Sequence, residues 1–278
     1  MTRGRRTRLR RILLGTVPLG VVTFFFLLPI LWMAGTSFQS NAKLFQSGMG
    51  WLPTALHPDN YPKALAAANF GRYFLNSGIV SLAVTVGNLV FGVLAGYGLA
   101  KFRFPGHRLV LLLILTTLML PLEVTLVPTF LVVHALGWIN TYQGMVGPLL
   151  VDAFGVFLMR QSMLAIPSDY MEAARIDGAG ELRILLRIML PQCIPALAVL
   201  AMFAFRDSWD QFLWPLTIVS VDHLRTYPLG LAQFGEDFGN PPTQQMAIAV
   251  LATIPVFLLF AVLQRALTRG FGLGGIKG

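Results

Sequence analysis

The chain has 278 residues, of which 55% are hydrophobic and 12% charged, and its mean hydropathy is +0.69. This composition excludes an ordinary soluble domain and favours a protein that resides in a lipid bilayer. The formal net charge is +9, but the basic residues lie between long apolar runs rather than on one polar face, which argues against nucleic acid binding.

The N-terminus resembles a signal peptide in its charge but not in its length. The start MTRGRRTRLRR is strongly basic, yet the apolar run that follows is too long for a signal peptide and lacks a small-residue cleavage site. We therefore expect a retained membrane anchor. Cys193 is the only cysteine and the four histidines are far apart, so neither an internal disulfide nor a metal site is expected.

Six apolar stretches are long enough to cross a bilayer core, which needs about 20 residues of helix. They run from 12 to about 34, 73 to 100, about 109 to 133, about 143 to 164, about 196 to 219 and about 246 to 263. In the third stretch Glu123 lies between Pro121 and Pro128, which predicts a kinked or broken helix. We predict an all-α, polytopic membrane protein with six transmembrane helices.

The basic residues predict the orientation, because Lys and Arg are retained on the cytoplasmic side of short loops. With the N-terminus inside, sixteen of the 21 Lys and Arg residues fall in inner segments and only four in outer ones. Both termini should be cytoplasmic. The chain divides into a basic N-terminus (residues 1–11), a transmembrane domain (12–264) and a C-terminal tail (265–278). In the first outer loop, WLPTALHPDNYPKAL suits turns followed by a short interfacial helix.

The inner loop 166–195 is the most informative segment of the sequence. It reads IPSDYMEAARIDGAGELRILLRIMLPQCIP and predicts two short helices. Ser168 is placed to cap the first helix, and Gly178 to end it in a left-handed conformation. In the second helix, Leu182, Leu185, Leu186 and Met189 recur at the spacing i, i+3, i+4 and i+7, and this predicts an apolar stripe along one face of the helix.

This loop resembles the EAA motif of ATP-binding cassette (ABC) importer permeases. The similarity extends over nearly the whole chain. It includes the segments WLPTALHPDNY, YFLNSGIV, MLPLEVTLVP, GVFLMRQSM, WDQFLWPL and the closing GLGGIKG. The chain resembles in particular the shorter six-span permease of maltose-type sugar transporters. The residues at the motif positions are Glu172, Ala173, Ala174, Asp177, Gly178 and Ala179.

The resemblance implies a transport subunit rather than an enzyme. It implies a multi-pass protein of a prokaryotic cell membrane that pairs as a heterodimer with a second, homologous permease, with two nucleotide-binding ATPase subunits and with an extracytoplasmic solute-binding protein. The helix 168–177 would dock on an ATPase subunit, and the tail, with Gly275 and Lys277, would reach toward the ATPase dimer. No GxxxxGK[ST] sequence is present, so ATP and Mg would bind the partner ATPases and this chain would need no cofactor. The alternative from the residue pattern is an amphipathic interfacial hairpin without a partner.

Ionisable residues within the spans default to functional hypotheses. They are Glu123, Asp152, Arg206, Asp207 and Asp210. Where members of the family most often have Asn, this chain has Asp210. Arg206 and Asp210 are four residues apart, so an ion pair along one helix is the simpler interpretation.

Aromatic residues suggest a solute path but also have a simpler interpretation. Trp209, Phe212 and Trp214 could stack on sugar rings, or anchor and pack the helix. We assign Trp209, Asp210 and Gln211 to the substrate path. Gly92 and Gly96 have the GxxxG spacing of helix packing.

Two rival functions fit parts of the sequence. A proton-coupled secondary transporter would use Glu123, Asp152 and Asp210 as a proton relay and would need no ATPase. An intramembrane enzyme would need two aspartates as an acid and base pair, but no glycine-rich catalytic signature surrounds them.

Overall fold

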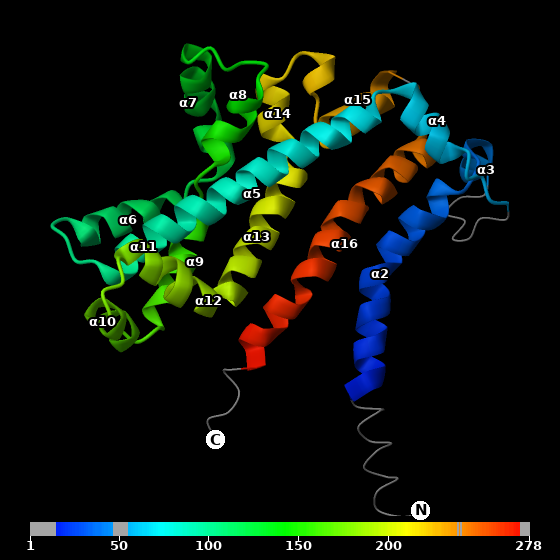
Figure 1. Cartoon of the computed structure of the whole chain (residues 1–278). Helices are drawn as coiled ribbons and strands as arrows, with labels where there is room; N and C mark the ends of the chain where they lie inside the picture. Colours follow the sequence, from blue (N-terminus) through cyan, green and yellow to red (C-terminus); the bar gives the residue numbers. More distant parts are fainter. Residues whose placement is uncertain (1–14, 47–54, 238, 240, 273–278) are drawn as a thin grey trace, which may run out of the picture. The chain divides into compact units, whose positions relative to one another are not determined.

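The computed structural model describes residues 15–46, 55–237, 239 and 241–272, and in these residues its regular structure is helical throughout (Figure 1). The chain divides into two compact units, one of residues 1–70 with 231–253 and the other of residues 71–230 with 254–278. The predicted all-α fold is confirmed.

The first unit is built around the N-terminal helix. It contains α2 (Val17–Ser37), α3 (Asn41–Gln46), α4 (Asn60–Ala67) and the beginning of α16 (Pro242–Gly272). The Asn60 amide donates to the backbone carbonyls of Ser37 and Gln39, each at 2.8 Å, and so fixes α4 against the end of α2. Helix α4 is the short helix that the first outer loop predicts. The residues 12–14 of the first predicted span lie outside the described residues.

The second unit holds the remaining helices. They are α5 (Phe70–Lys101), α6 (His107–Thr117), α7 (Leu122–Ala135), α8 (Tyr142–Val146), η2 (Gly147–Leu149), α9 (Ala153–Leu164), α10 (Asp169–Ile176), α11 (Glu181–Ile184), η3 (Leu185–Met189), α12 (Leu190–Gln192), α13 (Ile194–Trp209), α14 (Leu213–Ile218), η4 (Asp222–Leu224) and the start of α15 (Tyr227–Asp237).

Three helices are long and apolar enough to cross a bilayer alone: α2, α5 and residues Pro242–Thr268 of α16. Three further candidate spans are bent helix pairs. The bends are 106° between α6 and α7, 43° between α8–η2 and α9, and 83° between α11–α12 and α13. Six spans are therefore available when each bent pair counts as one.

Prolines explain two of the helix breaks. Pro121 has no N–H to donate to the carbonyl of Thr117, four residues earlier, and α6 ends at Thr117. The break predicted in the third span is confirmed, but only Pro121 causes it, since Pro128 lies inside α7. The predicted fifth span is wrong at its outer end. Helix α13 stops at Trp209, and α14 begins as a separate helix at Leu213; Pro215, which has no N–H to donate to the carbonyl of Gln211, favours a break in this segment.

Close helix packing holds α5 against α9. A Cβ atom added at Gly96 would lie 2.8 Å from the Cβ of Met159, and one at Gly92 would lie 3.3 Å from the backbone of Gly155. A side chain at Gly96 would force the helices apart and one at Gly92 would crowd them, so the GxxxG pair serves helix packing as predicted. A core beneath the inner loop continues this contact, and its methionines are Met159, Met163, Met171 and Met189.

Candidate coupling helix and solute cavity

Helix α10 presents one face to the protein core and the opposite face outward. Met171 is 2% exposed and Ala174 8% exposed, and both belong to the core beneath the loop. At 3.6 residues per turn, Glu172, Ala173 and Ile176 lie on the opposite side, and all three are exposed. Ile176 is 87% exposed. A fixed inner face and an outer face with an exposed branched apolar residue suit a docking helix.

The ends of α10 follow the sequence prediction in part. Gly178 has a φ of +78°, so the predicted left-handed turn after the helix is confirmed. Ser168 occupies the predicted N-cap position, but its side chain makes no capping hydrogen bond. The backbone of Ser168 has helical dihedral angles, so the start of α10 is held by packing rather than by a hydrogen bond from the serine hydroxyl.

A polar cluster ties α10 to the end of α5. The guanidinium of Arg175 donates from Nε to Oε1 of Glu181 at 2.8 Å, and the hydroxyl of Tyr97 donates to Oε2 at 2.7 Å. The hydrogen bond to Glu181 raises the pKa of Arg175 above its ordinary value. On the same end of α5, Lys101 donates to the carbonyl of Ile166 at 2.6 Å. The loop is thus attached to α5 on both sides of α10.

The second loop helix differs from the prediction. Residues Leu185–Met189 form a π-helical turn, which changes the spacing of the apolar face. Leu185 and Met189 are buried as expected, but Leu182 is 66% exposed and Leu186 is 53% exposed, and Ile184 is fully buried instead. Leu182, Leu185 and Leu186 of the predicted stripe still share one apolar surface, whereas Met189 lies in the core.

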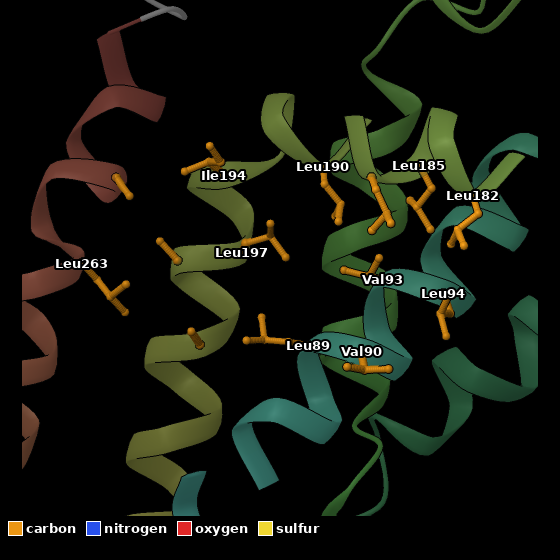
Figure 2. Close-up of a pocket in the computed structure, with 14 residues that line it drawn as sticks. Leu89, Val90, Val93, Leu94, Leu182, Leu185, Leu190, Ile194, Leu197 and Leu263 are labelled. Carbon is orange, nitrogen blue, oxygen red and sulfur yellow. The ribbon is translucent and has the colours of Figure 1, made fainter. Parts of the chain in front are cut away.

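The exposed part of this stripe lines an apolar groove of about 490 Å³. Figure 2 shows it, with Leu182, Leu185 and Leu190 of the loop beside Leu89 and Val93 of α5, and with side chains of α13 and α16 completing it. Its lining side chains carry no polar group, so it offers nothing to a hydroxyl-rich solute.

A second cavity of about 400 Å³ has a different lining and lies where several spans are broken. It is formed by α5, the start of α7, the segment between η2 and α9, and the last turns of α13. Its polar lining residues are Asn88, Asp152, Asp207, Ser208 and Gln211. No spacing in the sequence pointed to Asn88 or Ser208, because the cavity depends on how α5 meets three segments that are distant from it in the sequence.

The charged residues at the end of α13 form a small network. Arg206 lies 3.8 Å from the carboxylate of Asp210, the predicted i, i+4 pair, and 3.5 Å from that of Asp207, whose partner the sequence did not reveal. Asp210 also accepts a hydrogen bond of 2.6 Å from Tyr227. Burial, and then this hydrogen bond, raise the pKa of the Tyr227 phenol.

The aromatic candidates mostly lie in the protein core. Trp209 is 2% exposed and stacks on Phe205 at 5.7 Å, and Trp214 is 1% exposed and donates its Nε1 to the carbonyl of Gly144. Of the residues assigned to the substrate path, Gln211 lines the polar cavity, whereas Trp209 and Asp210 lie next to it in sequence but do not line it. Gly275 and Lys277 lie outside the described residues.

Comparison with known proteins identifies the family. Residues 88–272 match the family described as binding-protein-dependent transport system inner membrane component. The chain belongs to this family. It is a multi-pass permease subunit of the bacterial inner membrane and not itself an enzyme, and the matched region contains α10 and every residue that lines the polar cavity except Val84. Membership decides against the proton-coupled alternative.

Relatives cover nearly the whole chain. The arabinooligosaccharides transport system permease protein AraQ of Halalkalibacterium halodurans is 34% identical over 95% of both chains. The sn-glycerol-3-phosphate transport system permease protein UgpE of Rhizobium meliloti is 33% identical over 91% of this chain and 92% of its own. Among solved structures, a bacterial ABC transporter involved in the import of the acidic polysaccharide alginate matches with a TM-score of 0.80 and 25% identity, over 95% of this chain and 98% of that one.

Proposed function

We propose that this permease forms, with a second and homologous permease, the translocation pathway of an ABC importer for a sugar or sugar-like solute. The relatives named above supply the solute class, since their names refer to arabinooligosaccharides, glycerol phosphate and alginate. Two ATPase subunits, with ATP and Mg, and an extracytoplasmic solute-binding protein complete the assembly. Both termini of this chain are cytoplasmic in this proposal.

The observation that carries the coupling proposal is the outward face of α10. Glu172 and Ala173 there belong to the EAA motif, and Ile176 completes an apolar and acidic surface that a cleft on an ATPase subunit could bind. Ala173 lets a partner surface approach closely, while Ala174 lets the core do so from the other side. Asp177, Gly178 and Ala179 form the turn after the helix.

The attachments of the loop give the coupling its mechanics. Because Glu181 joins α10 to α5 and Lys101 joins α5 to Ile166, a push on α10 is transmitted to a transmembrane helix rather than lost in a mobile loop. Closure of the ATPase subunits would thus move the spans between inward-facing and outward-facing states. In this proposal the tail residues Gly275 and Lys277 also approach the ATPase dimer.

The path of the solute runs past the end of α13. Gln211 contacts the solute from the polar cavity in this proposal, and Trp209 and Asp210 hold the local geometry through their stacking and ion pairing.

A pair of charge reversals tests the coupling. Glu172→Lys in the reconstituted importer should leave assembly of the membrane subunits intact but abolish stimulation of ATP hydrolysis by loaded binding protein. The control is Arg103→Glu, which reverses an exposed charge in the separate loop between α5 and α6 and should leave stimulation unchanged. Normal stimulation in Glu172→Lys would refute the role of α10.

A further inference from the structure

The polar cavity has the size and lining of a ligand site. Its volume of about 400 Å³ lies within the range of roughly 300 to 1,000 Å³ that ligand pockets occupy. Phe154 and Phe203, whose ring centroids are 5.7 Å apart, form an aromatic part of its wall. Flat aromatic surfaces beside hydrogen-bonding groups suit the mixed faces of a saccharide ring.

Two buried polar atoms of the cavity lack the partners that such atoms require. Asn88 is 3% exposed, and its amide nitrogen donates to the carbonyl of Leu149 at 2.8 Å. Its oxygen Oδ1, and the hydroxyl of Ser208, which is 8% exposed, have no hydrogen-bond partner within the described part of the chain. Neither atom has exposed surface, and Oδ1 of Asn88 lies toward Gly155 of α9, so both belong to the wall behind the cavity. Direct contact with a solute falls to the exposed Asp152 and Asp207 and to the half-buried Gln211.

The carboxylates of the cavity are also available to a ligand. Asp152 stands at the N-cap position of α9, but its side chain makes no capping hydrogen bond to that helix. Asp207 has Arg206 as its cation, at 3.5 Å, which offsets part of its charge. The described lining includes no Lys, Arg or His, so an anionic ligand would meet two carboxylates without a basic residue on the wall.

We propose that this cavity is a solute-contact site that accepts a neutral, hydroxyl-rich saccharide and discriminates against anionic solutes. This inference rests on the proposed importer function and adds to it the charge of the solute that the site prefers. Hydroxyl groups of the solute donate to the carboxylates of Asp152 and Asp207 and accept from the amide nitrogen of Gln211. A phosphate or uronate would instead place an anion beside Asp152 and Asp207, so the relatives named for anionic solutes would differ from this chain in specificity.

Two alanines on α13 provide a matched test. Ala204 lines the polar cavity and Ala201 lines the apolar groove, one helical turn away. The native Cys193 is fully buried, so it gives little background when labelling is measured on this subunit. In the complete transporter, the variants Ala204→Cys and Ala201→Cys are labelled with a cationic and with an anionic methanethiosulfonate of similar size.

The charge of the cavity sets the expected result. The ratio of cationic to anionic labelling rates should be about tenfold higher at Ala204→Cys than at Ala201→Cys, and Asp152→Asn with Asp207→Asn should remove most of this excess. Equal ratios at the two positions, or a cysteine at 204 that neither reagent reaches, would overturn the proposal.

Solute protection tests the chemical class directly. Arabinotriose should slow labelling of Ala204→Cys but not of Ala201→Cys, and sn-glycerol-3-phosphate should protect neither. Protection by glycerol phosphate, or by a polyamine in place of the saccharide, would refute the selectivity. This result is separable from the proposed function, because importer activity is judged by stimulation of ATP hydrolysis, which can persist when the cavity has the opposite preference.

Discussion

Substituting Gly96 tests whether α5 and α9 pack at the distance described. The Cβ that Gly96→Ala adds would lie 2.8 Å from the Cβ of Met159 and 2.9 Å from the backbone nitrogen of Arg160. Backbone atoms cannot move aside cheaply, so the two helices must separate. Overpacking of this kind costs about 1 to 3 kcal/mol.

Gly98 provides the control on the same helix. A Cβ added there meets nothing within 4 Å. Helix propensity alone raises the free energy of unfolding of both variants by about 0.5 to 1 kcal/mol, because alanine has a higher helix propensity than glycine. This contribution cancels when the two variants are compared with each other. We therefore expect Gly96→Ala to be less stable than Gly98→Ala by about 1 to 3 kcal/mol, the overpacking cost alone.

Thermal unfolding of the detergent-purified transporter, followed by the loss of monodisperse protein, measures this difference. Gly98→Ala should unfold at or above the temperature of the native chain, and Gly96→Ala below it. Equal unfolding temperatures for the two variants would show that α5 and α9 are not in contact at Gly96, and the reasoning would fail.

Two further predictions concern polar contacts. Tyr97→Phe and Glu181→Ala should each reduce the stimulation of ATP hydrolysis by loaded binding protein. The double variant should be little worse than Glu181→Ala alone, because that change already removes both the hydrogen bond from Tyr97 and the ion pair with Arg175; a further loss on adding Tyr97→Phe would contradict a shared contact. Because burial raises the pKa of Tyr227 above its ordinary value of 10.0, its hydrogen bond to Asp210 stabilises the fold fully below that pH and less as the pH rises above it. Thermal stability measured across that range should fall more for the native chain than for Tyr227→Phe, and parallel curves would exclude the contribution of this phenol.

Sequence reasoning predicted the spans well because length and the absence of charge are properties of a continuous segment. The limits of α5 differ from the expected 73–100 by only a few residues. It also predicted the turn at Gly178, since a glycine that follows a short amphipathic helix commonly ends that helix in a left-handed conformation. These features depend on local chemistry alone.

Features that depend on the meeting of distant segments could not be predicted. The prolines of the third span predicted a kinked or broken helix, but they carried no information on the angle, which is 106° between α6 and α7. The π-helical turn at Leu185–Met189 shifted the buried face from the regular spacing. The cavity needs Asn88 from α5 and Ser208 from α13, which are 120 positions apart in the sequence, and the segment between them carries no signal of that proximity.

The methionine-rich core beneath α10 has a mechanical consequence. Met159, Met163, Met171 and Met189 are each at most 2% exposed and fill the space between α10, α9 and the π-helical turn. A methionine side chain has three rotatable bonds and no branch, so it can change rotamer and still fill an irregular space. When a partner displaces α10 by a small amount, the methionine side chains can repack without opening a void. The core beneath α10 therefore deforms with the helix instead of resisting its movement.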